Sequence, residues 1–212
     1  GVVSAAETFT RLAFGTPEPH HPPLPALTCD LSGIGGATCA EDLPLNAFRD
    51  FLIRYGADYL ASRDERIAAL LLAHLREWAQ ANALTVYPGI VIGAVNQPDF
   101  RPKYALQWVL VPFIQTWALL RDEPSVSSSD RLLIDGWLQR LVDYAIEPFG
   151  GPGAPEDAFN VSYLRRGLKM AWGILRRDDV AVTEGMEKVL MGLHQMRADG
   201  SFPREVARGA CA

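Results

Sequence analysis

The stretch KYALQWVLVPFIQTWALL, residues 103–120, limits how this chain folds more than any other feature. It predicts a helix with apolar side chains on nearly every face, whereas a helix at a protein surface keeps one face polar. Such a helix must be covered on both sides by other elements. No apolar run in the chain approaches the ~18 residues that a membrane span requires, so we expect a globular protein.

Apolar residues at a 3.6-residue period predict five further helices, the first beginning at Leu45. Capping signals indicate where two of them start: Ser62 with Glu65, and Ser127 with Asp130. Connections that are alternately short and long favour antiparallel helix pairs in two concentric layers, as a bundle, a solenoid or a toroid. The fold class is therefore all-α. The predicted helices cover about 45–60, 62–81, 103–120, 131–146, 158–178 and 183–198.

Residues 1–42 are rich in proline, glycine and threonine and predict an irregular arm over the helical domain. The start, GVVSAAETF, fits either the small-residue tail of a cleaved secretory signal or a cloning remnant. Cys29 and Cys39 flank a glycine-rich loop, and they either form a disulfide in an oxidising compartment or stay reduced. Cys211 is left over. We expect a periplasmic or secreted protein.

The overall charge argues against two classes of partner. A net charge of −5 disfavours nucleic acid and a polybasic contact with a membrane surface. The sequence has no zinc-ligand pattern, no phosphate loop and no dinucleotide-binding fingerprint. We therefore expect neither a metal nor an organic cofactor.

Three basic clusters in this acidic chain point to an anionic ligand. Asn160 and Tyr163 lie in the first turns of a predicted helix, where unpaired N–H groups and the helix dipole favour anions. The simpler alternative is that Asn160 caps this helix and that the basic residues after it are solvated. The other clusters are Arg101 with Lys103, before the apolar helix, and Arg204 with Arg208, in the final ADGSFPREVARGACA.

Four stretches together resemble the alginate lyases, which are polysaccharide lyases built on a helical toroid. YLASRDERIAALLLAHLREWAQANAL is similar to their second-helix region, and FRPKYALQW to an Arg-Lys-Trp-Ala-Leu stretch. FNVSYL stands where the family has Asn-Asn-His-x-Tyr-Trp. DGSFPREVARGACA closely resembles the family's Asp-Gly-x-Leu-Pro-x-Glu-x-x-Arg-Gly-x-x-Ala. The resemblance covers residues 43–212 and implies an incomplete (α/α) toroid.

The resemblance also implies β-elimination on a uronate polysaccharide. Asn160 matches the asparagine that neutralises the substrate carboxylate, and Arg208 matches the active-site arginine; both are the expected catalytic residues. The expected substrate-binding residues are Arg101, Lys103, Tyr163 and Arg204.

Two departures from the family pattern leave the activity open. Val161 replaces the family's histidine, and the catalytic tyrosine of the family lies further past the arginine than this chain extends. We therefore expect a domain truncated at its C-terminal end, whose open face is covered by the rest of the toroid or by a second chain. The sequence is compatible with a lyase acting on alginate, polymannuronate or a glucuronan-like polymer, with a non-catalytic periplasmic protein that binds an acidic exopolysaccharide, and with a plain helical scaffold.

Overall fold

The computed structural model describes residues 20–27, 29–30, 38–39, 42–87, 100–147 and 160–200. The regular elements of this part of the chain are helices apart from one small hairpin, which confirms the all-α prediction. The elements are β1 (Cys29–Asp30), β2 (Thr38–Cys39), α2 (Asp42–Ser62), α3 (Glu65–Gln80), α4 (Phe100–Leu120), α5 (Ser128–Ile146), α6 (Asn160–Arg176) and α7 (Asp179–His194).

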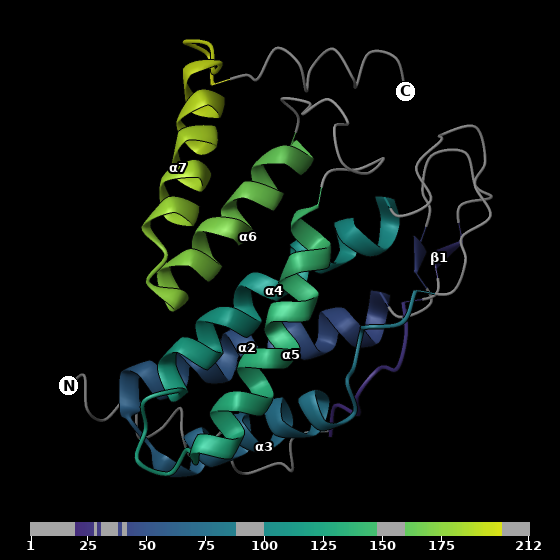
Figure 1. Ribbon diagram of the computed structural model, residues 1–212, viewed down its shortest axis with the longest axis vertical. Helices are drawn as coiled ribbons and strands as arrows, with labels where there is room; N and C mark the ends of the chain where they lie inside the picture. The colour runs from purple at the N-terminus through teal and green to yellow at the C-terminus, as the bar shows by residue number, and fades with distance from the viewer. Residues whose placement is uncertain are drawn as a thin grey trace.

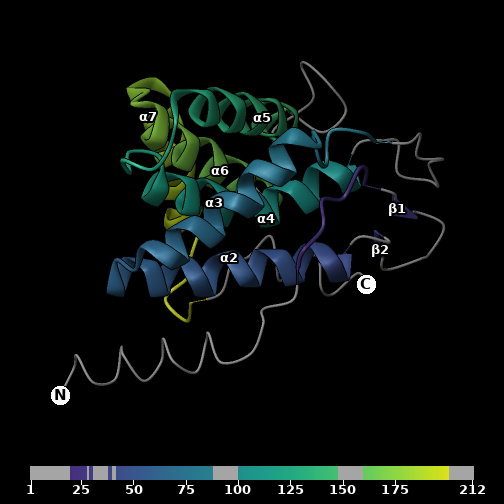
Figure 2. The same ribbon diagram turned by 90° about the horizontal axis from the view of Figure 1, so that it is seen from below.

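The helices form antiparallel pairs arranged in layers (Figure 1). Helices α2, α4 and α6 lie side by side with α4 in the middle. The chain reverses direction after each of them, so α3 and α5 pack against one another and cover α2 and α4 from one side (Figure 2). Helix α7 returns along α6 and packs mainly against it.

Helix α4 is apolar on nearly all sides because it contacts four other helices, α2, α3, α5 and α6. Phe113 of α4 meets Phe48 of α2 edge-on, with ring centroids 5.1 Å apart. Phe48 in turn stacks on Trp78 of α3 at 4.1 Å. These rings are all but inaccessible to solvent, so the core is centred on α4, as the sequence predicts.

One of the two predicted capping boxes is present and the other is not. Ser127 accepts a hydrogen bond from the amide of Asp130, and the Asp130 carboxylate accepts one from the Ser127 amide. Ser62, by contrast, is the last residue of α2, and its hydroxyl donates to the Asp58 carbonyl. Arg63 has a φ of 54°, which ends α2, so that Asp64 rather than Ser62 caps α3.

Helices α7 and α4 also begin at earlier residues than predicted. Helix α7 begins at Asp179 instead of residue 183, because the Asp178 carboxylate caps it by accepting hydrogen bonds from two amides. Helix α4 begins at Phe100, which places Arg101 and Lys103 in its first turn rather than in the preceding loop. Pro102 is tolerated there because the first amides of a helix have no intrahelical partner.

The described residues of the N-terminal arm that precede α2 are non-helical. Strands β1 and β2 pair antiparallel, and Cys29 is the register partner of Cys39. The side chains of both cysteines lie outside the described residues, so their disulfide stays a prediction. None of the described helices combines the length and the hydropathy needed to cross a membrane.

Candidate functional site

Four of the predicted site residues lie on two helices, α4 and α6. Figure 1 shows α4 and α6 beginning, and α5 and α7 ending, in the upper half of the view. The contact of Lys103 with Glu147 places the first turn of α4 against the end of α5, and α4 also packs against α6. We call this region the site end. It carries Arg101 and Lys103 on α4, and Asn160 and Tyr163 on α6.

Lys103 is the most deeply buried of these residues, with 1% of its surface exposed. Its ammonium group donates to Glu147 Oε2 at 3.1 Å and lies 5.1 Å from the centre of the Tyr144 ring. An ammonium group taken out of water needs such an anionic partner, and the ring adds a cation–π attraction. Lys103 therefore joins the start of α4 to the end of α5, and its contact with substrate stays a prediction.

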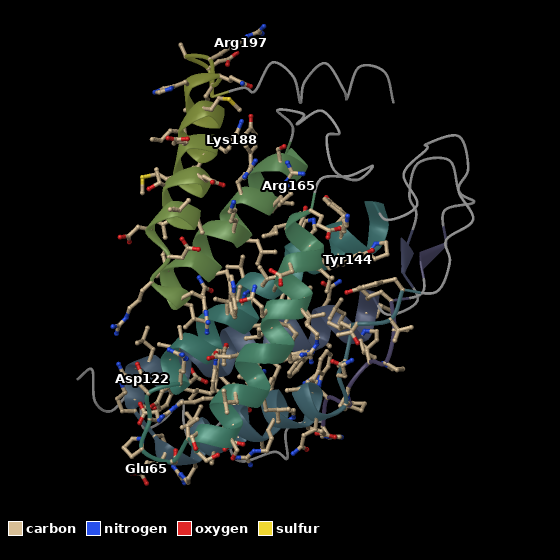
Figure 3. The ribbon with its side chains drawn as sticks, in the orientation of Figure 1. Glu65, Asp122, Tyr144, Arg165, Lys188 and Arg197 are labelled. Atoms are coloured by element: carbon tan, nitrogen blue, oxygen red, sulfur yellow. The ribbon has the colours of Figure 1, made fainter. Side chains whose placement is uncertain are left out.

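A pair of stacked tyrosines lies beside Lys103. The rings of Tyr87 and Tyr144 are 4.0 Å apart and nearly parallel, at 11° (Tyr144 is labelled in Figure 3). Burial and, secondarily, Tyr144 raise the pKa of Tyr87 well above its ordinary value, so its phenol stays neutral at physiological pH. Gln107 donates to the Ala145 carbonyl at 2.8 Å in the same region. The junction of α4 and α5 is thus fixed by buried polar contacts.

Tyr163 faces α7 and packs on the backbone of Gly192. A Cβ atom at position 192 would lie only 2.7 Å from Tyr163 Cε1. The Tyr163 hydroxyl also donates to Gln195 Oε1, at a long 3.4 Å. Tyr163 therefore sets the spacing between the start of α6 and the end of α7. Its expected role in binding substrate is not tested by these contacts.

The basic residues that follow Asn160 are not simply a solvated face. Arg165 is 4% exposed (labelled in Figure 3), and Arg166 lies 3.7 Å from Glu184 of α7. Lys169 donates to the same carboxylate. The hydrogen bond from Lys169, followed by its charge, holds the pKa of Glu184 below its ordinary value. Much of the positive charge of this segment thus holds α6 and α7 together.

Several predicted residues lie wholly or partly outside the described residues. Asn160 begins α6, as expected, but its side chain and those of Arg101 and Val161 are not described. Arg204 and Arg208 lie entirely outside. Within the described ranges, no group of histidine, cysteine, aspartate and glutamate is arranged to hold a metal ion.

Sequence reasoning missed the Glu147, Tyr87 and Tyr144 contacts of the site end. Glu147 follows its helix as a single carboxylate, and Tyr87 lies before a loop rich in glycine and proline. No local pattern links either of them to Lys103. Their proximity arises only when α4 and α5 pack together.

Comparison with known proteins gives one family. Residues 45–212 match the family model described as alginate lyase. A polysaccharide lyase from Stenotrophomonas maltophilia (strain K279a) is 29% identical over 167 residues, which are 78% of this chain and 47% of that protein.

Solved structures of alginate lyase A1-III share the fold. The A1-III structure from Sphingomonas species A1 matches with a TM-score of 0.66 and 22% identity, over 94% of this chain and 60% of that one. A Tyr-to-Phe variant of A1-III complexed with a tetrasaccharide matches with a TM-score of 0.64 and 22% identity, over the same shares. The six helices therefore correspond to part of the (α/α) toroid of A1-III, and the chain spans about half to three-fifths of the length of these relatives. Because residues 45–212, which are most of this chain, match the family model, the chain belongs to the alginate lyase family.

Proposed function

We propose that this chain carries part of the active site of a polysaccharide lyase that cleaves an acidic uronate polymer by β-elimination. The observation that carries the proposal is the family match over residues 45–212, because it spans both Asn160 and Arg208. The A1-III variant that is complexed with a tetrasaccharide supports a saccharide as the ligand. Alginate, polymannuronate and a glucuronan-like polymer are the candidate substrates.

The reaction requires three events at one uronate residue. A base removes the proton at C5, the electron pair of that bond forms the C4=C5 double bond, and the C4–O4 bond breaks while O4 receives a proton from an acid. The C5 proton becomes acidic enough only when the adjacent carboxylate is neutralised. Neutralising the substrate carboxylate is therefore the first requirement that residues of this chain must meet.

Asn160 and Arg208 are the proposed neutralising pair. Asn160 begins α6, so an amide side chain, the first backbone N–H groups and the positive end of the helix dipole are available at one place. A guanidinium group such as that of Arg208 binds a carboxylate through two parallel hydrogen bonds. Arg101 and Arg204 are proposed to bind neighbouring uronates. Lys103 and Tyr163, beyond the substrate contacts expected of them, hold the helix ends in place.

Proton transfer is the open part of the mechanism. Val161 has no proton to give or take, and it stands where the family has a histidine. In the family the tyrosine serves as both base and acid, so the elimination remains feasible with a tyrosine supplied by a longer polypeptide. General acid–base groups typically contribute ~10²–10⁴-fold, so we expect a slower reaction or a different preferred uronate.

Val161 also favours a second function, a periplasmic protein that binds an acidic exopolysaccharide without cleaving it. Such a protein would keep Asn160 and Arg208 for binding alone. In either case we place the protein in the periplasm or outside the cell.

We also propose that the rest of the toroid, or a second chain, covers the outer side of the last helix pair. Several large apolar side chains there are about half exposed or more: Ile174, Val180, Met186, Leu190, Leu193 and Met196. Exposed apolar side chains in such number on one helix pair are typical of a surface that another element covers.

The decisive experiment is a lyase assay of the full-length protein with three polymers, namely polymannuronate, polyguluronate and polyglucuronate, in which the ultraviolet absorbance of the unsaturated product is followed. We expect a rise with one polymer that is abolished in Arg208→Ala and kept in Arg197→Ala, a matched exposed arginine at the end of α7. Binding without any rise would identify the non-catalytic protein. The proposal would be overturned if the protein neither bound nor cleaved any of the three polymers.

A further inference from the structure

Residues 20–27 form a strap that lies against α3 and leads to β1 (purple in Figure 1). Specific backbone bonds hold it. The indole N–H of Trp78 donates to the His21 carbonyl at 2.9 Å, and the amide of Leu84 donates to the Leu24 carbonyl at 2.9 Å. The amide of Leu27 donates to the Val86 carbonyl at 3.0 Å. The strap is therefore docked at discrete points along its length.

The side chain of His21 is placed among aromatic rings. Its ring centroid lies 5.0 Å from that of Phe51, 5.8 Å from that of Phe48 and 6.2 Å from that of His74. Its Nε2 atom is buried and has no hydrogen-bond partner among the described residues. A neutral imidazole fits this environment far better than a charged one.

His74 adds a second imidazole to the surroundings of His21. It is 7% exposed, and its Nδ1 lies 2.9 Å from the Leu70 carbonyl, which can only accept. Nδ1 therefore carries the proton, and Nε2 is a bare, buried nitrogen without a partner in the described part of the chain. A proton added to His21 would place an unpaired charge beside the His74 imidazole and two phenylalanine rings.

We propose that the strap is an acid-released clamp: it is held while His21 is neutral and detaches when His21 takes up a proton. The nearby groups on α3 are His74 and Glu77, those on α2 that touch the ring are the uncharged Phe48 and Phe51, and the strap itself adds His20.

The direction of the pH effect follows from the state in which His21 binds its proton more tightly. Burial, followed by the charges of His74 and His20, lowers the pKa of His21 from its ordinary value of 6.5 in the docked strap. The detached strap keeps the ordinary value. Docking is therefore fully favourable above about pH 6.5 and weakens as the pH falls below it.

His20 adds only a weak contact between the strap and α3. Its Nε2 donates to Glu77 Oε2 at 2.8 Å, and both side chains are largely exposed, at 60% and 43%. An exposed pair of this kind contributes little to stability, and solvent screens it. We therefore expect His21 to determine the behaviour of the strap in acid.

The far end of the strap connects to the site end. Ala26 and Val86 form a parallel bridge, and Leu27 bonds to Val86. The next residue, Tyr87, stacks on Tyr144 beside Lys103. Release of the strap thus removes the support of the segment that carries Tyr87, and the site end loosens in acid.

Hydrogen exchange of the full chain tests the clamp at single amides. Protection of Leu84 and Leu27, corrected for the intrinsic exchange rate, is compared between about pH 7.5 and pH 5 with that of Leu110 in the core of α4. We expect protection of the two strap-bonded amides to fall by up to about tenfold per pH unit, as linkage to one proton allows, while Leu110 stays protected. His21→Phe should abolish the pH dependence, and His20→Gln should keep it.

Two results would overturn the clamp. One is wild-type protection of Leu84 and Leu27 that does not change with pH. The other is an equal pH dependence in His21→Phe, which would assign the effect to another group. His21→Gln serves as a second uncharged variant if the phenylalanine does not fit, and the wild-type titration decides the question where neither variant folds.

Discussion

Gly192→Ala tests whether close contact between α6 and α7 shapes the site end. The new Cβ would lie 2.7, 2.9 and 3.2 Å from three atoms of the Tyr163 ring. Unstrained carbon atoms stay about 3.5–4.0 Å apart, so the helices must separate by about 1 Å or the ring must turn. Overpacking of this kind costs about 1–3 kcal/mol, and the better helix propensity of alanine returns about 0.5–1 kcal/mol. We expect a net loss of about 1 kcal/mol, the difference between the middle values of the two ranges.

Gly167→Ala on α6 is the matched control, because nothing lies within 4 Å of the Cβ that it would gain. It should stabilise the protein by up to about 1 kcal/mol through helix propensity alone. For a chain of this length, 1 kcal/mol corresponds to about 2–4 °C in the melting temperature. Thermal melts followed by circular dichroism should therefore move in opposite directions for the two variants.

Gly192→Ala in a Tyr163→Ala protein tests whether Tyr163 causes the loss of stability. In a Tyr163→Ala protein the ring is absent, so Gly192→Ala should lose most of its cost, and the double-mutant cycle should show a coupling of at least about 1 kcal/mol. The reasoning is refuted if Gly192→Ala is as stable as Gly167→Ala. It is refuted equally if the cost of Gly192→Ala persists without the ring.

Three further predictions concern other contacts. Lys103→Met should change the free energy of unfolding by less than about 1 kcal/mol in urea titrations, because methionine fills the site without a charge, whereas Lys103→Ala leaves a cavity and should cost at least about 2 kcal/mol. Hydrogen bonds from Arg76, then Ser127, hold the pKa of Asp130 below its ordinary value of 3.8, so stability should decline as the pH falls below about 4. Asp130→Asn should lower stability at pH 7 and flatten that decline. An unchanged loss of stability in acid in this variant would contradict the assignment. Cys29 and Cys39 are register partners, which places their Cα atoms about 4.5–5.5 Å apart, within the range of a disulfide. Under oxidising conditions, a thiol titration of the denatured chain should therefore find one free thiol. Three free thiols would exclude the bond.

The layered fold could be predicted because a helix buried on all sides has apolar residues on nearly every face, and this pattern is visible in the sequence. The apolar stretch that became α4 could be stable only between other helices, and it contacts four of them. Helix ends were less certain where two capping residues compete. Ser127 has no competitor and caps α5, whereas Asp64 caps α3 in place of Ser62 once Arg63 turns left-handed.

The site was predictable only where a motif carries it. The resemblance selects Asn160 and Arg208 by position, and no periodicity of the chain would have done so. The partner of Lys103 is 44 residues away in the sequence, and that of Tyr163 is a glycine on the next helix. Such contacts depend on how helices approach one another, which local sequence does not encode.

The attachment of α7 mainly to α6 has a consequence for local stability. A helix that packs mainly against one neighbour contributes a single interface to stability. Helix α7 should therefore open at a lower free energy than the helices around α4. The segment that bears Arg204 and Arg208 follows this helix in the chain. Whatever covers the outer face of α7 would then also raise the free energy required to displace these two arginines.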